Sequence, residues 1–177
     1  MTPATYSAAE KLHDGAQIEI RALRPDDEAD MLAAIDRTAE ESLRRRFFGF
    51  KREFSEKEKA FFLNVDFVNH VALVATTAEG GRNRIVGGGR YIVTEPGRGE
   101  VAFVVIDAYQ GKGIGAVLTR HLTNLARAAG LRELVADVLP ENAAMRTVLA
   151  KYGFRAGRSQ DPQVIHMTMQ LTDSSKG

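Results

Sequence analysis

The chain has 177 residues, of which 44% are hydrophobic and 27% are charged, and its formal net charge is +1. This length and composition fit one globular domain with a sizeable core. Domains that bind nucleic acid are normally strongly basic, so the near-neutral balance argues against nucleic acid as a partner.

The first residues, 1–17, are small and polar and lack the apolar core of a signal peptide. The longest apolar run, Val101 to Ile106, is too short to cross a bilayer. We therefore expect a cytoplasmic protein with no membrane partner. We also expect one domain over residues 18–171, with flexible tails at 1–17 and 172–177.

Two residue types limit the chemistry that the chain can perform. Cysteine is absent, which excludes disulfides, thiolate metal ligands and cysteine nucleophiles. The four histidines are scattered and lack the spacing of a metal site, so we predict no metal. No G-x-S-x-G turn is present, and a serine hydrolase is therefore unsupported.

The N-terminal third predicts one strand followed by helices. Residues 18–23 alternate like a half-buried strand, and apolar positions between Met31 and Ile35 fit one face of a helix. A second helix is expected near residues 40–48. Residues 55–58 have the capping-box pattern that begins a third helix.

The rest of the chain predicts a β-rich middle followed by alternating strands and helices. Strands are expected at 70–77, 84–94, 100–106, 133–139 and 164–171, and helices at 113–129 and 142–152. Strands that meander and then alternate with helices favour an α/β (α+β) fold, a mixed sheet with helices on both faces.

The segment between the strand at 100–106 and the next helix is rich in glycine. Residues 110–115 read Gln-Gly-Lys-Gly-Ile-Gly. Small residues let backbone N–H groups converge on one point, and the new helix adds its unpaired N–H groups and partial positive charge. The segment therefore predicts an anion site suited to a pyrophosphate, with Lys112 as a nearby cation.

Three interpretations of this turn stay open on the glycine spacing alone. It fits an ordinary Gly-rich loop, a coenzyme A site or a dinucleotide fingerprint, because Gly111, Gly113 and Ala116 match G-x-G-x-x-A and Glu133 follows at a suitable distance. The strand stops four residues before Gly111 and does not run into the turn, which argues against a dinucleotide-binding site. No Gly-Lys-Ser/Thr ends the motif, which excludes a P-loop.

The order of motifs resembles the GCN5-related N-acetyltransferases (GNAT). The apolar strand 101–106, a short spacer and the turn from Gln110 match the family's Gln/Arg-x-x-Gly-x-Gly/Ala hallmark. Asn142 and Gly153-Phe154 follow in the family's order. The resemblance implies the GNAT fold, a mostly antiparallel twisted sheet of about seven strands that splay apart at the cofactor site.

Three further stretches are similar to the catalytic domain of bacterial Pat-type protein lysine acetyltransferases. They are residues 20–27, residues 40–49 and residues 100–105. The resemblance implies acetyl-CoA as co-substrate and an amine acceptor, either a protein lysine or a small molecule. It also allows a homodimer. A non-catalytic module that senses acetyl-CoA is the alternative.

The family pattern also implies the residues that bind the cofactor. They are Phe103, Val104, Val105, Gln110, Gly111, Lys112, Gly113, Ile114, Gly115, Ala116 and Asn142. Backbone groups of Val104 and Val105 would contact the pantetheine arm, a backbone N–H there would polarise the thioester, and the turn would hold the pyrophosphate. Asn142 also fits a helix N-cap, and both roles are compatible.

The catalytic candidate is Glu100, which lies at the start of the strand and ten residues before Gln110. This is the position of the glutamate base in Pat-type enzymes. A base is needed because a lysine amine with a pKa of about 10.4 is almost fully protonated at pH 7. A general acid is not evident, since Leu149 occupies the position where many GNAT enzymes place a tyrosine and Tyr152 is interpreted as structural.

Overall fold

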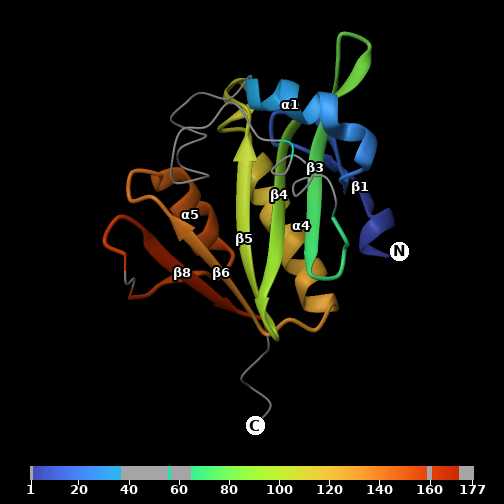
Figure 1. Ribbon diagram of the computed structural model, residues 1–177. Helices are drawn as coiled ribbons and strands as arrows, with labels where there is room; N and C mark the ends of the chain where they lie inside the picture. Colours follow the sequence, from blue (N-terminus) through green and yellow to red (C-terminus); the bar gives the residue numbers. More distant parts are fainter. Residues whose placement is uncertain (1, 37–55, 57–64, 159–160, 172–177) are drawn as a thin grey trace.

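The computed structural model describes residues 2–36, 56, 65–158 and 161–171 (Figure 1). The strands are β1 (Ser7–Lys11), β2 (Gln17–Ala22), β3 (His70–Glu79), β4 (Arg82–Glu95), β5 (Arg98–Val105), β6 (Glu133–Val138), β7 (Arg155–Ala156) and β8 (Ile165–Gln170). The α-helices are α1 (Glu28–Asp36), α4 (Ile114–Ala128) and α5 (Ala143–Lys151), and short 3-10 helices are η1 (Pro3–Thr5), η2 (Pro25–Asp27) and η3 (Asp107–Tyr109).

The described strands form one eight-stranded sheet in the order β1-β2-β3-β4-β5-β6-β8-β7. Every neighbouring pair is antiparallel except β5 and β6, which are parallel. The predicted mixed, mostly antiparallel sheet is therefore confirmed. Eight strands replace the expected seven or so because β1 and the two-residue β7 carry little sequence pattern of their own.

Residues 7–11 differ from the expected flexible N-terminal tail, since they form β1 and pair with β2. Side chains reach from this strand to α4: the Tyr6 hydroxyl hydrogen-bonds to Nδ1 of His121, and His121 Nε2 lies 2.7 Å from Glu10 Oε1. These polar contacts hold a strand that has no fully buried residue. Periodicity of apolar residues could not reveal it.

Several expected elements lie outside the described residues. They are the helix at 40–48, most of the capping box at 55–58 and the tail at 172–177.

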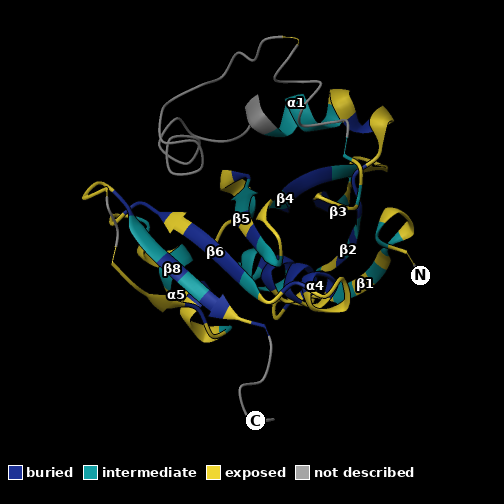
Figure 2. Ribbon diagram, turned by 60° about the horizontal axis from the view of Figure 1, so that its bottom comes forward, coloured by how far each residue is buried: buried dark blue, intermediate teal, exposed yellow. Residues whose placement is uncertain are grey.

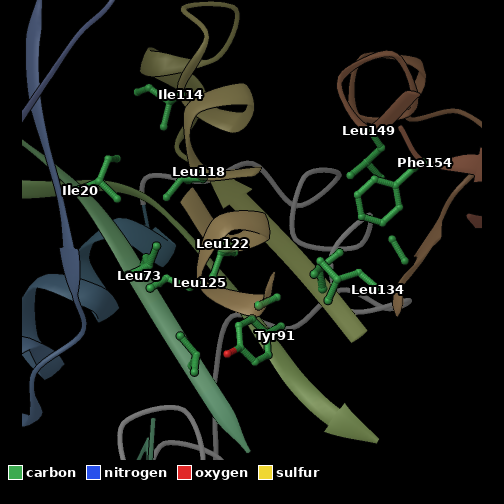
Figure 3. Close-up of a cluster of buried hydrophobic side chains, with 14 of the residues drawn as sticks. Ile20, Leu73, Tyr91, Ile114, Leu118, Leu122, Leu125, Leu134, Leu149 and Phe154 are labelled. Atoms are coloured by element: carbon green, nitrogen blue, oxygen red, sulfur yellow. The ribbon is translucent and has the colours of Figure 1, made fainter. Parts of the chain in front are cut away.

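The sheet buries apolar side chains on both faces, because residues alternate along each strand. On one face, Ile20, Leu73 and Tyr91 pack with Leu118 and Leu122 of α4 in the larger core cluster (Figure 3). The other face carries a smaller cluster, in which Ala72 and Val74 pack against α1. The predicted arrangement, with helices on both faces, follows from these two clusters. Figure 2 shows that β3 and β6 are largely buried.

The glycine run of β4 lets large side chains lie against the strand. Gly89 is paired with Phe103 of β5, and a Cβ at Gly89 would lie 2.6 Å from Phe103 Cδ1 and 2.9 Å from Leu122 Cδ1. The strand continues through the run. The absent side chain of Gly89 makes room for the Phe103 ring.

No helix among the described residues is long and apolar enough to span a membrane.

Candidate active site

The two parallel strands at the centre of the sheet separate along their length. Pairing of β5 with β6 covers Arg98 with Glu133, Gly99 with Leu134 and Glu100 with Val135, and it stops there. Both strands continue, β5 to Val105 and β6 to Val138. Figure 1 shows the two ribbons diverging beyond this point. The splay that the family resemblance implies is therefore present.

A cavity of about 490 Å³ occupies the opening between the separated strands. Its walls come from β5, the Gly-rich turn, the first turn of α4, the end of β6 and the helix α5. The lining residues are Glu100 to Val105, Tyr109, Gln110, Gly111, Gly113 to Ala116, Ala136 to Val138, Asn142, Ala144, Met145, Val148 and Leu149. Of the twelve predicted site residues, eleven line this one cavity, and Lys112 does not.

The Gly-rich turn has the backbone geometry that the predicted anion site requires. Gly111 and Gly113 have φ of 78° and 94°, conformations that other residues rarely adopt. Gly113 is the N-cap of α4 and supplies no side-chain cap, and the first intrahelical bond is Val117 N–H to Gly113 O. Helix geometry therefore leaves the N–H groups of Ile114, Gly115 and Ala116 available to a ligand.

Gln110 fixes the shape of the turn. Its side-chain nitrogen donates to Val105 O at 3.0 Å and to Asp107 Oδ1 at 3.3 Å. These bonds join the end of β5 to the 3-10 helix η3 and the turn. The glutamine of the hallmark therefore holds the turn against the end of β5.

Lys112 points to the N-terminal hairpin. Its ammonium lies 3.2 Å from Asp14 Oδ2, and it lies 5.8 Å from the centre of the Tyr109 ring. The backbone N–H of Ala16 and the Lys112 ammonium together hold the pKa of Asp14 below its usual value. The hairpin also brings the His13 ring to 3.5 Å from where a Cβ at Gly113 would lie. The turn is thus braced by residues that the sequence pattern did not connect with it.

The register of β5 decides which of its backbone groups face the cavity. Ile106 N–H bonds to Val86 O of β4. Because N–H and C=O groups alternate between the two sides of a strand, those of Val104 also point to β4, while those of Phe103 and Val105 point into the opening. A backbone contact with a ligand in the opening therefore falls to Phe103 and Val105, and the expected contact of the Val104 backbone is wrong because its groups point to β4.

Asn142 caps α5 at the other side of the opening. Its Oδ1 accepts a hydrogen bond from Met145 N–H at 3.2 Å, which is the expected N-cap contact. The side chain also lines the cavity, and its amide nitrogen can donate to a ligand there.

Leu149 lies in the second half of α5 and is 1% exposed. It lines the cavity as an apolar wall, whereas Tyr152 caps the C-terminus of α5 outside the set of lining residues. The position at which many GNAT enzymes place a tyrosine therefore supplies no proton donor.

Glu100 stands at the point of separation. It is exposed, pairs with Ile92 of β4 and Val135 of β6, and lines the cavity. Its neighbours in the alternation, Gly99 and Val101, are buried in the sheet. The carboxylate is therefore directed to the face of the sheet opposite the larger core cluster.

Sequence reasoning missed Asp137 and the apolar wall of α5. Asp137 is exposed among the apolar residues that follow Glu133 in β6, lines the cavity and lies 2.7 Å from His166 of β8. A charged residue in the middle of the apolar run 134–139 was the available signal. The wall of Met145 and Val148 follows from helical spacing only once the direction of α5 is known.

Comparisons with known proteins agree with this geometry. The family model described as the acetyltransferase (GNAT) domain matches residues 17–155. The chain is 36% identical over 160 residues to acetyltransferase PA5475 of Pseudomonas aeruginosa, which covers 89% of this chain and 86% of that protein. The chain belongs to the GNAT family of acetyltransferases.

Two solved structures extend the comparison. The GNAT domain of Streptomyces lividans PAT superposes with a TM-score of 0.85 at 31% identity, over 93% of this chain and 96% of that domain. The resemblance to a Pat-type domain is thereby confirmed. The Salmonella typhimurium protein yncA, solved with acetyl-CoA as its cofactor, shares the fold with a TM-score of 0.70 at 20% identity, over 90% and 97% of the two chains.

Proposed function

We propose that this protein transfers the acetyl group of acetyl-CoA to an amine by direct attack, with Glu100 as the general base. The observation that carries the proposal is one cavity that joins an anion-binding turn, open strand backbone and a carboxylate. The yncA structure holds acetyl-CoA on the same fold. The acceptor is a protein lysine or a small-molecule amine.

The negative charges of acetyl-CoA set the direction in which it would lie along the opening. Its pyrophosphate suits the N–H groups of Gly111 to Ala116, where the positive end of the α4 dipole lies. The pantetheine arm suits the backbone groups of Phe103 and Val105. A thioester oxygen that accepts an N–H from β5 would carry the developing negative charge in the transition state.

The reaction removes two protons from the ammonium and replaces the C–S bond of the thioester with a C–N bond. Glu100 takes the first proton from the ammonium, directly or through one water, and the neutral nitrogen then attacks the thioester carbon. The C–S bond breaks, and the second proton leaves the nitrogen for water as the amide forms. Deprotonating a lysine-like amine at pH 7 costs about 4–5 kcal/mol, which a positioned base offsets. Since Leu149 supplies no acid, coenzyme A leaves as a thiolate and takes a proton from water.

Two assays test the proposal. Isothermal titration measures acetyl-CoA binding. Release of the coenzyme A thiol is then followed with a panel of acceptors: proteins that present lysine side chains, polyamines and amino acids. Binding with acceptor-dependent thiol release supports the transferase. Binding without any acceptor-dependent release would favour a sensor of acetyl-CoA, and binding of NADH in its place would overturn the cofactor assignment.

A further inference from the structure

Negative charge is concentrated in one part of the cavity. Among the described residues that line it, the charged side chains are Glu100 and Asp137, and both are acidic. The anion-binding turn lies at another part of the same cavity. The coenzyme's phosphates are therefore drawn to the turn, while the two carboxylates give the remaining part a negative potential.

The two carboxylates lie on the same face of the sheet. Glu100 pairs with Val135 in parallel register, and paired residues of neighbouring strands point to the same side. Asp137 lies two residues beyond Val135 and shares its face, whereas Leu134, Ala136 and Val138 enter the larger core cluster on the opposite face. Glu100 and Asp137 thus flank the place where the strands separate.

His166 fixes the position of the second carboxylate. It lies directly opposite Asp137 in the β6–β8 register, and its Nδ1 is 2.7 Å from Asp137 Oδ1. The side chains are 26% and 35% exposed, so the pair lies at the rim of the cavity. Among the described residues no other partner is recorded for this carboxylate, and Oδ2 is able to accept a hydrogen bond from a ligand.

The carboxylate of Asp137 is suited to bind a positive charge on the acceptor that persists through the reaction. The reacting amine must become neutral, and a second carboxylate beside it would hold it protonated. Glu100 accepts the proton of that amine, so Asp137 has no role in its deprotonation. A separate cationic group on the acceptor would neutralise Asp137 and keep its own charge throughout.

We infer that Asp137, positioned by His166, is a specificity-determining residue that binds a second positive charge on the acceptor. This inference rests on the proposed amine acetylation. The acceptor class is an amine with a neighbouring cation, either a lysine beside a basic residue in a polypeptide or a small diamine. The interaction acts in acceptor binding, so it affects KM more than kcat.

The test compares matched acceptors that differ by one charge. The pairs are 1,4-diaminobutane with butylamine, and a lysine peptide with arginine as neighbour with the same peptide carrying glutamine there. We expect the wild type to favour the dicationic member in kcat/KM, and Asp137→Asn to raise KM for that member about three- to tenfold, as for a partly exposed ion pair. The KM for the monocationic member and the Kd for acetyl-CoA stay unchanged.

Glu133→Gln is the matched control. Glu133 lies on the same strand and, by alternation, on the same face, but it is outside the cavity lining and its carboxylate is 4.0 Å from Arg98. It should leave the preference intact, and His166→Ala should reduce it less than Asp137→Asn does. An unchanged preference in Asp137→Asn overturns the inference alone. Absence of turnover with every acceptor in the wild type overturns the proposed function and the inference with it.

Discussion

Glu100 and Val135 form the last pair between β5 and β6 before the strands separate. The proposed base is therefore tied to the sheet by neighbours on both sides, while the next residues of β5 are open to the cavity. This arrangement fixes the backbone of Glu100 at the edge of the opening, and its side chain lines the cavity. It also explains why a position at the start of a strand can serve the chemistry of a cleft.

The Gly-rich turn gives the first prediction. Gly113→Ala should weaken acetyl-CoA binding about tenfold or more, because φ of 94° strains any residue with a Cβ by roughly 1–2 kcal/mol and the turn would relax away from its anion-binding shape. Isothermal titration measures the change.

Gly130→Ala is the control, since Gly130 has φ of 83° just beyond the C-terminus of α4 and no atom within 4 Å of an added Cβ. It should lower the free energy of unfolding by a similar amount and leave the acetyl-CoA Kd unchanged. Equal Kd values for the two variants would contradict the proposed role of the turn.

The contact between Gly89 and Phe103 gives the second prediction. Gly89→Ala places a Cβ 2.6 Å from Phe103 Cδ1, so the ring must move, and the variant should lose about 1–3 kcal/mol of stability from overpacking. Because Phe103 lines the cavity, acetyl-CoA affinity should fall as well. Gly88→Ala is the comparison: its Cβ would meet Leu73 O at 3.2 Å, away from Phe103, and affinity should persist.

Asn142 gives the third prediction because two substitutions distinguish its N-cap role from its proposed contact with the cofactor. Asn142→Ala removes the cap of α5 and should lower the free energy of unfolding by about 1 kcal/mol. Asn142→Asp keeps a cap acceptor, so stability should hold, but it replaces the amide donor with a negative charge in the cavity. Acetyl-CoA should then bind more weakly. Unchanged affinity in the aspartate variant would leave Asn142 with the N-cap role alone.

Much of this site was predictable from the sequence because strand, spacer, turn and helix are contiguous. The turn from Gln110 to Ala116 and the preceding strand carry their own local pattern, and the structure brings them to one cavity. Strong alternation likewise predicted β2, and long apolar runs predicted β3 and β5 within a few residues.

The remaining features depend on contacts between distant parts of the chain. β1 is held by Tyr6 and Glu10 against His121, more than a hundred residues away, and no local periodicity reports such a bond. Lys112 faces Asp14 for the same reason. Asp137 joins the cavity only because β5 and β6 part after Glu100, a property of pairing and not of either strand's sequence.

The pairing of Arg21 with Asp27 gives a prediction about pH. Burial alone would raise the pKa of Asp27, but hydrogen bonds from Arg21 and from the Arg24 N–H outweigh it and hold the pKa below its usual value of 3.8. A depressed pKa in the folded state stabilises the protein above pH 3.8, and this contribution is lost as the pH falls through the folded-state value.

Asp27→Asn should therefore cost roughly 3 kcal/mol at pH 7, where Arg21 loses its buried partner. Urea unfolding at several pH values measures the free energy of unfolding. The difference in this free energy between wild type and variant should narrow below pH 4. Asp26→Asn, on the same turn but exposed, should show no such gap. A gap that stays constant down to pH 2 would contradict the assignment.

The most direct test is turnover of Glu100→Gln at neutral pH with a responsive amine from the acceptor panel. The side chain keeps its size and its place at the strand separation but cannot accept the amine proton. We predict that kcat falls by about 10²–10⁴-fold, as for loss of a general base, while the acetyl-CoA Kd stays within twofold. Raising the pH should recover part of the rate, since more of the amine is then neutral. Unchanged turnover with intact acetyl-CoA binding would contradict Glu100 as the base.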